Sequence, residues 1–246
     1  FANVEYGNTL SNIQLDETCK LYIDATATSG TTIDRSWALL VKGGHPYKEA
    51  AYNIATGNID NCISYAQVEI TRTGDLKDQI NIGTLLGAAS GANDDISVPG
   101  KMSNCKNYGT IWIHDFNQGA GYGTTPYNYY TIVGGLAGEI GGYVVSNCEN
   151  HGNIVIENCD MKTGTLYVGG LVGYNCNRVN SNTSNLMGDI NNCRNYGSFL
   201  VGQDESKPVA LNNVGLAGIC ARFQWGGISY CDNYGEFKIK ATQNDA

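Results

Sequence analysis

The chain has 246 residues, a net charge of −8 at pH 7 and a pI of about 4.8. Its 15 lysines and arginines are scattered along the sequence. Binding to a phosphate backbone needs several basic side chains on one face, so nucleic acid and anionic membrane surfaces are disfavoured as partners. No apolar run is long enough to cross a bilayer as a helix, so no membrane insertion of this segment is expected. A chain of this length can bury a sizeable core in one continuous domain, and we expect a monomer.

Residues 1–59 are expected to form an N-terminal cap or degenerate repeats. Apolar residues alternate around Leu21 and Ile23, which is the period of a β-strand with one buried face. Cys19 lies 43 residues before Cys62, a spacing that returns further along the chain. This segment is therefore interpreted as a worn first repeat or as a cap over open strand edges.

From residue 60 onward a six-residue phrase recurs, with starts 43, 43, 45 and 38 residues apart. The copies are a worn one at Asn61–Ala66 and four clearer ones at Asn104–Gly109, Asn147–Gly152, Asn192–Gly197 and Tyr230–Gly235. Alternating apolar residues follow each copy, such as Ile111 and Ile113 after the second, and predict a strand with one face inward. A fixed period of this length is typical of repeat architectures, so residues 60–246 are predicted to be the repeat body.

A second phrase, Gly-Gly-Leu-x-Gly, lies upstream of most copies of the first. It is complete at Gly134–Gly138 and Gly169–Gly173 and degenerate at Gly83–Gly87 and Val214–Gly218. Paired glycines beside one leucine indicate a sharp backbone turn under packing so close that a Cβ would clash.

Together these two phrases resemble the GLUG motif of exported surface proteins of bacteria, notably gut Bacteroidetes, over roughly residues 60–240. The resemblance and the period together predict an all-β fold, a right-handed β-helix-like solenoid built from repeats of about 43 residues. The motif implies no particular activity. The chain opens without a signal peptide, and we interpret it as a mature or truncated piece of a secreted or cell-surface protein.

Two residue types recur at fixed repeat positions and are expected to form columns inside the stack. Asparagine side chains can bond from coil to coil, and reduced cysteine is a good small core residue. The expected columns comprise Asn107, Asn150, Asn195 and Asn233, a second set of Asn104, Asn147 and Asn192, and the thiols of Cys62, Cys105, Cys148, Cys193 and Cys231.

Metal binding and disulfide formation are the alternatives for the cysteines. Zinc is disfavoured because Cys-x-x-Cys pairs are absent and the chain has only three histidines. A disulfide network suits an exported protein, although the cysteine count is odd. Cys159 and Cys176, which flank the second glycine phrase, are the pair to test for a bridge.

The link Asp115–Thr131 is the longest between a repeat strand and the next glycine phrase, and it is rich in aromatic residues. Trp112, just before it, should point outward because Ile111 and Ile113 point inward. The candidate ligand-binding residues are Trp112, Phe116, Tyr122, Tyr127, Tyr129 and Tyr130. A tyrosine offers a flat apolar face and a hydroxyl, which suits a sugar ring or a protein interface. The alternative is that these rings only cover the flank of the stack.

No catalytic residue, metal site or cofactor is predicted. The sequence has no Gly-x-Ser-x-Gly elbow, no His-Glu-x-x-His and no P-loop. His151 replaces the tyrosine of its repeat position and is interpreted as structural. The expected function is therefore surface recognition or adhesion, with a glycan or a host surface protein as partner. The alternatives are a rigid spacer within a larger surface protein, or a polysaccharide-degrading β-helix enzyme that uses paired carboxylates.

Overall fold

The computed structural model describes residue 4 and residues 7–24, 36–43, 57–73, 79–90, 100–118, 130–161, 164–178, 186–224 and 226–242. All regular structure in these ranges is β-strand, which confirms the all-β prediction. Within them there is no helix that could span a membrane.

The strands form five sheets, numbered here in the order in which the chain enters them. Sheet 1 holds β1 (Thr9–Ser11), β5 (Asn58–Asp60), β10 (Lys101–Ser103), β15 (Val144–Ser146), β21 (Asp189–Asn191) and β27 (Gly227–Ser229). Sheet 2 holds β2 (Gln14–Leu15), β6 (Ile63–Ser64), β11 (Lys106–Asn107), β16 (Glu149–Asn150), β22 (Arg194–Asn195) and β28 (Asp232–Asn233). Sheet 3 holds β3 (Lys20–Asp24), β7 (Gln67–Thr73), β12 (Ile111–Gln118), β17 (Ile154–Met161), β23 (Phe199–Val201) and β29 (Phe237–Ile239), with β24 (Val209–Ala210) also beside β17.

The last two sheets follow a longer link. Sheet 4 holds β4 (Ser36–Ala38), β8 (Ile80–Gly83), β13 (Tyr130–Gly134), β18 (Thr165–Gly169) and β25 (Val214–Ala217). Sheet 5 holds β9 (Leu86–Ser90), β14 (Ala137–Gly141), β19 (Val172–Arg178) and β20 (Leu186–Met187), with β26 (Cys220–Phe223) also beside β19. Among the described strands every pairing is parallel except that of β19 with β20.

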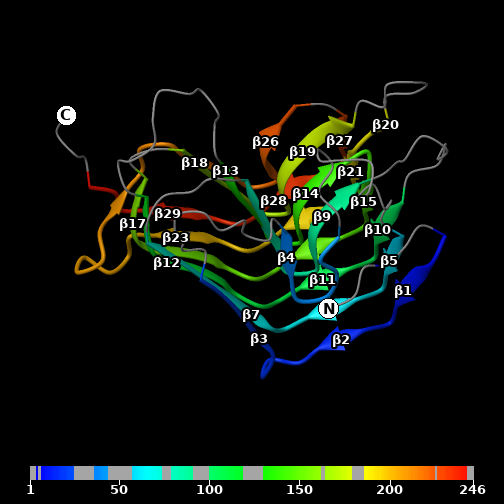
Figure 1. Ribbon diagram of the computed structural model, residues 1–246, viewed down its shortest axis with the longest axis horizontal. Coiled ribbons are helices and arrows are strands. Elements are labelled where there is room, and N and C mark those ends of the chain that lie inside the picture. Colours follow the sequence, from blue (N-terminus) through cyan, green and yellow to red (C-terminus); the bar gives the residue numbers. More distant parts are fainter. Residues whose placement is uncertain are drawn as a thin grey trace, which may run out of the picture.

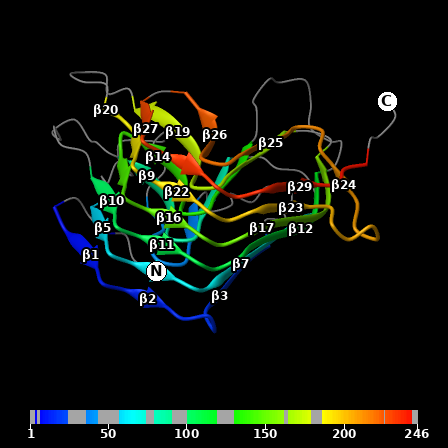
Figure 2. The ribbon, with the colours of Figure 1, turned by 180° about the vertical axis from the view of Figure 1, so that it is seen from behind.

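Neighbouring strands of a sheet lie one sequence period apart. Met102 pairs with Ile59 on one side and with Val145 on the other, each 43 residues away. The chain therefore passes once through all five sheets before it returns to the first. In Figures 1 and 2 the strands of each sheet follow one another in colour, and sheets 4 and 5 lie between sheet 3 on one side and sheet 1 on the other.

The N-terminal strands join the same stack, but with a different offset from the one predicted. Thr9 pairs with Asn58, 49 residues later, and Ile63 bonds to the carbonyl of Ile13. Ile13 therefore precedes β2 as Cys62 precedes β6, whereas Cys19 is exposed. The spacing of 43 residues between Cys19 and Cys62 is therefore not the offset of this first passage, which differs in length from the later ones.

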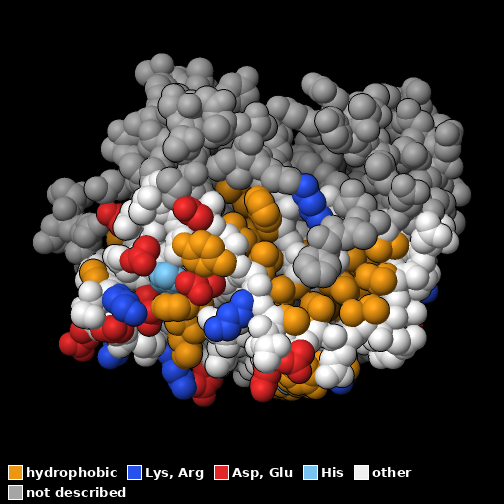
Figure 3. Space-filling view, turned by 60° about the horizontal axis from the view of Figure 1, so that its bottom comes forward, with side chains coloured by type: hydrophobic (Ala, Val, Ile, Leu, Met, Phe, Trp, Pro, Cys, Tyr) orange, Lys and Arg blue, Asp and Glu red, His pale blue; other side chains and the backbone are white. Residues whose placement is uncertain are grey.

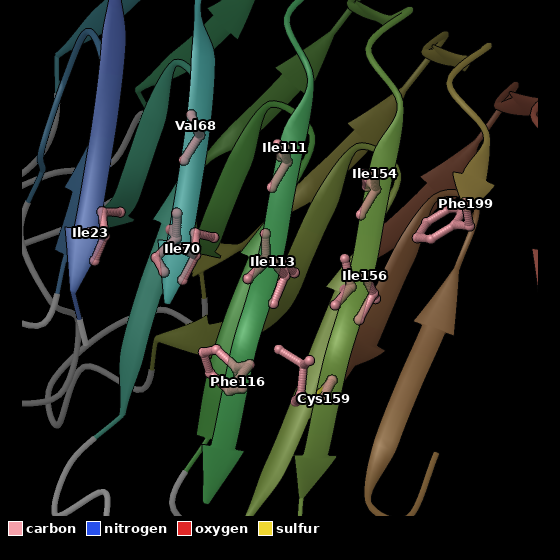
Figure 4. Close-up of a cluster of buried hydrophobic side chains, with 14 of the residues drawn as sticks. Ile23, Val68, Ile70, Ile111, Ile113, Phe116, Ile154, Ile156, Cys159 and Phe199 are labelled. Atoms are coloured by element: carbon pink, nitrogen blue, oxygen red, sulfur yellow. The ribbon is translucent and has the colours of Figure 1, made fainter. Parts of the chain in front are cut away.

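The core consists of columns of apolar side chains that run from strand to strand. Ile111 and Ile113 are buried and align with Val68 and Ile70 of β7, which confirms the predicted alternation (Figure 4). One cluster joins sheets 3 and 4, and a second joins sheets 1, 2 and 5. Each fully buried aliphatic side chain contributes about 1.5–3 kcal/mol relative to an exposed one.

The predicted asparagine column is confirmed. The Nδ2 of Asn107 donates to the Oδ1 of Asn150 at 2.8 Å, Asn150 donates to Asn195 at 2.8 Å, and Asn195 donates to Asn233 at 2.7 Å. A Cβ on Gly135 would lie 2.0 Å from the carbonyl oxygen of Gly170 and 2.8 Å from the Cγ of Asn150. The Gly-Gly turn between sheets 4 and 5 therefore packs directly on this column, and only glycine fits.

The second asparagine column is continuous at one step only. Asn192 donates to Asn147 at 2.7 Å, whereas Asn104 donates to the carboxylate of Asp60 at 2.9 Å. The prediction that Asn104 joins the column is wrong, because a charged carboxylate on the preceding strand is the stronger acceptor.

All nine cysteines are free thiols in the structure. Cys62, Cys105, Cys148 and Cys193 are buried in register, with the amide of Cys105 3.4 Å from the Sγ of Cys148. Burial raises the pKa of the Cys148 thiol well above its ordinary value. Cys159 and Cys176, the pair singled out for a test, form no bridge: Cys159 lies in the core between sheets 3 and 4, and Cys176 lies in a separate cluster.

Candidate ligand-binding surface

A column of five stacked rings lies on the outside of the stack, immediately after the strands of sheet 2. We call it the ring ladder; it consists of Tyr65, Tyr108, His151, Tyr196 and Tyr234, the fifth residue of each six-residue phrase. Neighbouring centroids are 4.6–5.1 Å apart and neighbouring planes differ by 11–14°. Parallel strands in register place equivalent residues one strand spacing apart, about 4.8 Å, which is also the distance at which flat rings stack.

The ladder presents ring edges rather than ring faces to solvent. Its four tyrosines are 38–59% exposed, although the ring faces between neighbours cover one another, and only the outer faces of the end rings Tyr65 and Tyr234 have no ladder ring over them. A ligand lying along the ladder would therefore meet a regular row of ring edges. The ladder thus combines contact area with a regular spacing along the stack.

Charged side chains of sheet 2 flank the ring ladder and alternate in sign. Lys106 bonds to Glu149 at 2.9 Å, and Arg194 lies 3.7 Å from Asp232. Glu149 also bonds to the Nε2 of His151 at 2.9 Å. The His151 contact and then Lys106 hold the pKa of the Glu149 carboxyl below its usual range.

Removal of one ring from the middle of the ladder is expected to destabilise the fold. Tyr108→Ala loses stacking on both Tyr65 and His151, so the free energy of unfolding should fall by about 1–3 kcal/mol at about 0.5–1.5 kcal/mol per ring pair. Urea denaturation measures this. Tyr22→Ala is the control, because Tyr22 is an exposed tyrosine outside the ladder. Equal losses in the two variants would show that the stacking contributes nothing.

A second group of side chains surrounds Trp112 on the outer face of sheet 3. We call it the Trp112 cluster; it comprises Glu69, Trp112, His114, Asp115, Glu157 and Lys207. The ring of Trp112 stacks on His114 at 3.9 Å and donates from Nε1 to Glu157 at 3.1 Å. Figure 3 shows acidic side chains and one histidine gathered around hydrophobic side chains on part of this surface.

Hydrogen bonds tie the acidic groups of the Trp112 cluster to their neighbours. His114 lies 2.9 Å from Glu69 through Nε2 and 2.9 Å from Asp115 through Nδ1. Lys207 donates to Glu157 at 3.1 Å. Bonds from Asn158 and then His114 lower the pKa of Asp115, so its carboxylate stays charged. The result is a hydrogen-bonded surface with three carboxylates, one lysine and one tryptophan.

The structure separates the six residues predicted to bind a ligand. Trp112 points outward as predicted, while its neighbours Ile111 and Ile113 are buried. Tyr122, Tyr127 and Tyr129 lie outside the described residues. Tyr130 belongs to sheet 4, away from the outer face of sheet 3.

Phe116 is fully buried, so its prediction as a ligand-binding residue is wrong. The cause is the left-handed conformation of Asp115, with φ of 48°, where the pairing register between β12 and β7 shifts. This bulge inserts one residue into the alternation and turns Phe116 inward, opposite Arg72.

A third group of interacting side chains lies between sheets 4 and 5, and no sequence pattern indicates it. The guanidinium of Arg222 lies 4.1 Å from the ring centroid of Tyr130 and 4.4 Å from that of Tyr174. Glu139 is completely buried beside them and accepts hydrogen bonds from Gln79 at 2.6 Å and from the thiol of Cys176 at 3.2 Å. Burial raises the pKa of Glu139 to about 7.

In the described part of the chain, no three His, Cys, Asp or Glu side chains are grouped so as to hold a metal ion. No protein-family model matches the chain, and no curated protein or solved structure is significantly similar to it.

Proposed function

We propose that this chain is a β-solenoid of the GLUG type on a secreted or cell-surface protein, and that it recognises an extended ligand, a glycan strand or a surface protein. Support for the architecture comes from the parallel sheets, in which strands one sequence period apart are hydrogen-bonded neighbours. A right-handed coil is the form that parallel crossover connections adopt.

The observation that carries the proposed recognition is the ring ladder. Partly exposed aromatic side chains gathered on one side of a molecule mark binding surfaces more often than scattered ones do. Trp112 provides a further partly exposed ring, on the outer face of the strand that follows Tyr108 in the chain. Aromatic groups, carboxylates and Lys207 together can contact sugar C–H groups and hydroxyls, or the side chains of a protein.

A glycan is the ligand that we favour. The ladder and the alternating charges of sheet 2 repeat at one strand spacing along the stack, and a polymer of similar units can make the same contact at each step. The carboxylates of the Trp112 cluster are bonded to Trp112, His114, Asn158 or Lys207. We therefore assign them a positioning role and propose no catalysis.

A rigid spacer is the second candidate, and one observation favours it. The ladder rings stack on one another outside the sheets, and the asparagine side chains bond to one another inside. Both columns therefore connect neighbouring strands and stiffen the stack along its length. A spacer would need these columns without any ligand.

The test is binding of the chain to a panel of polysaccharides and host surface glycoproteins, together with Trp112→Ala. We expect at least one glycan to bind and the variant to lose more than tenfold in affinity, about 1.4 kcal/mol. Tyr230→Ala is the control, because Tyr230 is 84% exposed but outside both the ladder and the Trp112 cluster.

Each other outcome has a defined meaning. If the folded chain binds nothing on the panel, recognition is refuted and the spacer is favoured. If both variants bind as the wild type does, the site lies elsewhere. If reducing sugar ends are released in the same incubations, the chain hydrolyses the glycan, and the proposal of binding without catalysis is wrong.

A further inference from the structure

The repeat cysteines lie at the corner between sheets 1 and 2, one in each passage of the chain. We call them the thiol column; it consists of Cys62, Cys105, Cys148, Cys193 and Cys231. The first four are completely buried in one apolar cluster. Stacked rings of neighbouring passages are 4.5–5.1 Å apart, both in the ring ladder and between Phe199 and Phe237. Neighbouring sulfur atoms of the thiol column are therefore about one strand spacing apart, about 4.8 Å.

This spacing suits a linear metal site better than a disulfide. A disulfide draws the two Cβ atoms to about 3.8 Å from each other, whereas strands in register hold them about 4.8 Å apart. Metal–thiolate bonds are about 2.3 Å long, so two such bonds in line span about 4.6 Å. A tetrahedral site needs more ligands than the described residues group together, but a two-coordinate ion needs only two sulfur atoms.

The backbone donates hydrogen bonds to the inner sulfur atoms of the column. The amide of Cys62 lies 3.5 Å from the Sγ of Cys105, and the amide of Cys105 lies 3.4 Å from the Sγ of Cys148. The amide of Cys148 lies 3.4 Å from the Sγ of Cys193. A hydrogen bond donated to sulfur favours the thiolate, which is the form that binds a metal. The inner sulfur atoms therefore already have the outer partners that a metal-bound thiolate needs.

The fold does not depend on the thiol protons. The thiol of Cys105 donates to the carbonyl oxygen of Ser103 at 3.1 Å, and the same oxygen also accepts the amide of Asn61 at 3.0 Å. The carbonyl oxygens that accept the thiols of Cys148 and Cys193 are likewise bonded to backbone amides. Loss of these protons would leave no buried carbonyl group without a donor, so deprotonation avoids the usual cost of an unsatisfied polar group.

We propose that neighbouring thiols of this column bind a soft monovalent cation of the copper(I) and silver(I) class, in linear coordination by two sulfur atoms. Thiolate is a soft ligand that suits such ions, whereas structural zinc takes four ligands. One ion and two thiols form two metal–sulfur bonds and release two protons, and no electron is transferred. The bound pair carries one net negative charge, which the amide at each inner sulfur offsets. This proposal is independent of the recognition proposed above.

The test is binding of silver(I) to the full chain, measured by competition with free cysteine. All proteins carry Cys19→Ser, because the exposed thiol of Cys19 would bind silver by itself. Silver(I) is added to the folded chain and, separately, during refolding from urea, so that burial of the column does not prevent loading. We expect at least one silver ion per chain. X-ray absorption should show two sulfur neighbours around it and no nitrogen or oxygen.

Two double variants separate pairs of thiols from single thiols. Cys105→Ser with Cys193→Ser leaves three column thiols, none of which is next to another. This variant should weaken silver binding by roughly 100-fold or more, since loss of an outer partner alone costs about 10–100-fold. Cys62→Ser with Cys231→Ser is the matched control: it also leaves three column thiols, but these are neighbours and should bind as tightly as the wild type does.

A second control is Cys159→Ser. Cys159 is buried as deeply, but its neighbours in register are Phe116 and Val209, so its loss should leave silver binding unchanged. Far-UV circular dichroism verifies that each variant is folded. If a double variant does not fold, X-ray absorption of the wild type decides, and silver with only one sulfur neighbour overturns the proposal. So does a chain that holds no silver by either route, or equal affinity in the two double variants.

Discussion

Asn150→Ala is expected to lower the free energy of unfolding by about 4 kcal/mol. Its buried amide accepts a hydrogen bond from Asn107 at 2.8 Å and donates to Asn195 at 2.8 Å and to the carbonyl of Gly152 at 3.0 Å. Each lost bond costs about 1 kcal/mol, and each buried partner left unsatisfied costs about 1–3 kcal/mol. Water cannot replace the amide easily, because Gly135 packs against it.

Asn233→Ala is the matched control, because it removes the same side chain at the exposed end of the column. That variant loses the bonds to Asn195 and Gly235 where solvent can replace them, so a cost of about 1 kcal/mol is expected. Urea denaturation of both variants measures the difference. If the two variants lose the same free energy of unfolding, the buried asparagine column does not hold neighbouring strands together more than local turn formation does.

The inner columns could be predicted because they follow from the repeat alone. Once the copies of the phrase are aligned, Asn107, Asn150 and Asn195 must stack if the strands pair one period apart. The ring ladder follows from the same alignment. The ring of His151 takes the place of a tyrosine between Tyr108 and Tyr196, as its position in the repeat predicts.

The burial of Phe116 could not be read from alternation, because alternation assumes that each residue advances the strand by one step. Asp115 and Asn158 both adopt positive φ, of 48° and 44°, and each inserts a residue that restarts the pattern. Aspartate and asparagine are the non-glycine residues that tolerate this conformation best. Their spacing of 43 residues, one period, was the available signal.

Glu139 was missed for a different reason. The glycine phrase predicts the sharp turn between sheets 4 and 5. It does not predict that the two sheets then pack face to face, so that both faces of each sheet are buried. Ile132, Tyr174 and Cys176 form a small cluster on that side. Alternation in a sequence identifies a buried strand face only when apolar residues occupy that face. Here the buried face carries a carboxyl group, an amide and tyrosines, so the pattern does not reveal it.

Glu139 is expected to make the protein less stable as the pH rises from about 4.5 to 7. Burial raises its folded pKa to about 7, from 4.5 for an exposed glutamate, although the bond from Cys176 and the charge of Arg222 act in the opposite direction. Below pH 4.5 the carboxyl is protonated in both the folded and the unfolded state, so no penalty applies. Above it the unfolded chain releases the proton while the folded chain keeps it, and stability falls until the folded pKa is passed.

The loss over this window should be about 3 kcal/mol, at about 1.4 kcal/mol for each pH unit between the two pKa values. Glu139→Gln carries no titratable proton, so its free energy of unfolding should lack this decline. Every other ionisable group is present in both proteins, so the contributions of those groups cancel in the difference. Urea denaturation of the two proteins between pH 4.5 and 8 gives the comparison, and parallel curves would refute a buried, protonated Glu139. Arg222→Gln provides a second check, because removal of the guanidinium should raise the folded pKa further and extend the decline to higher pH.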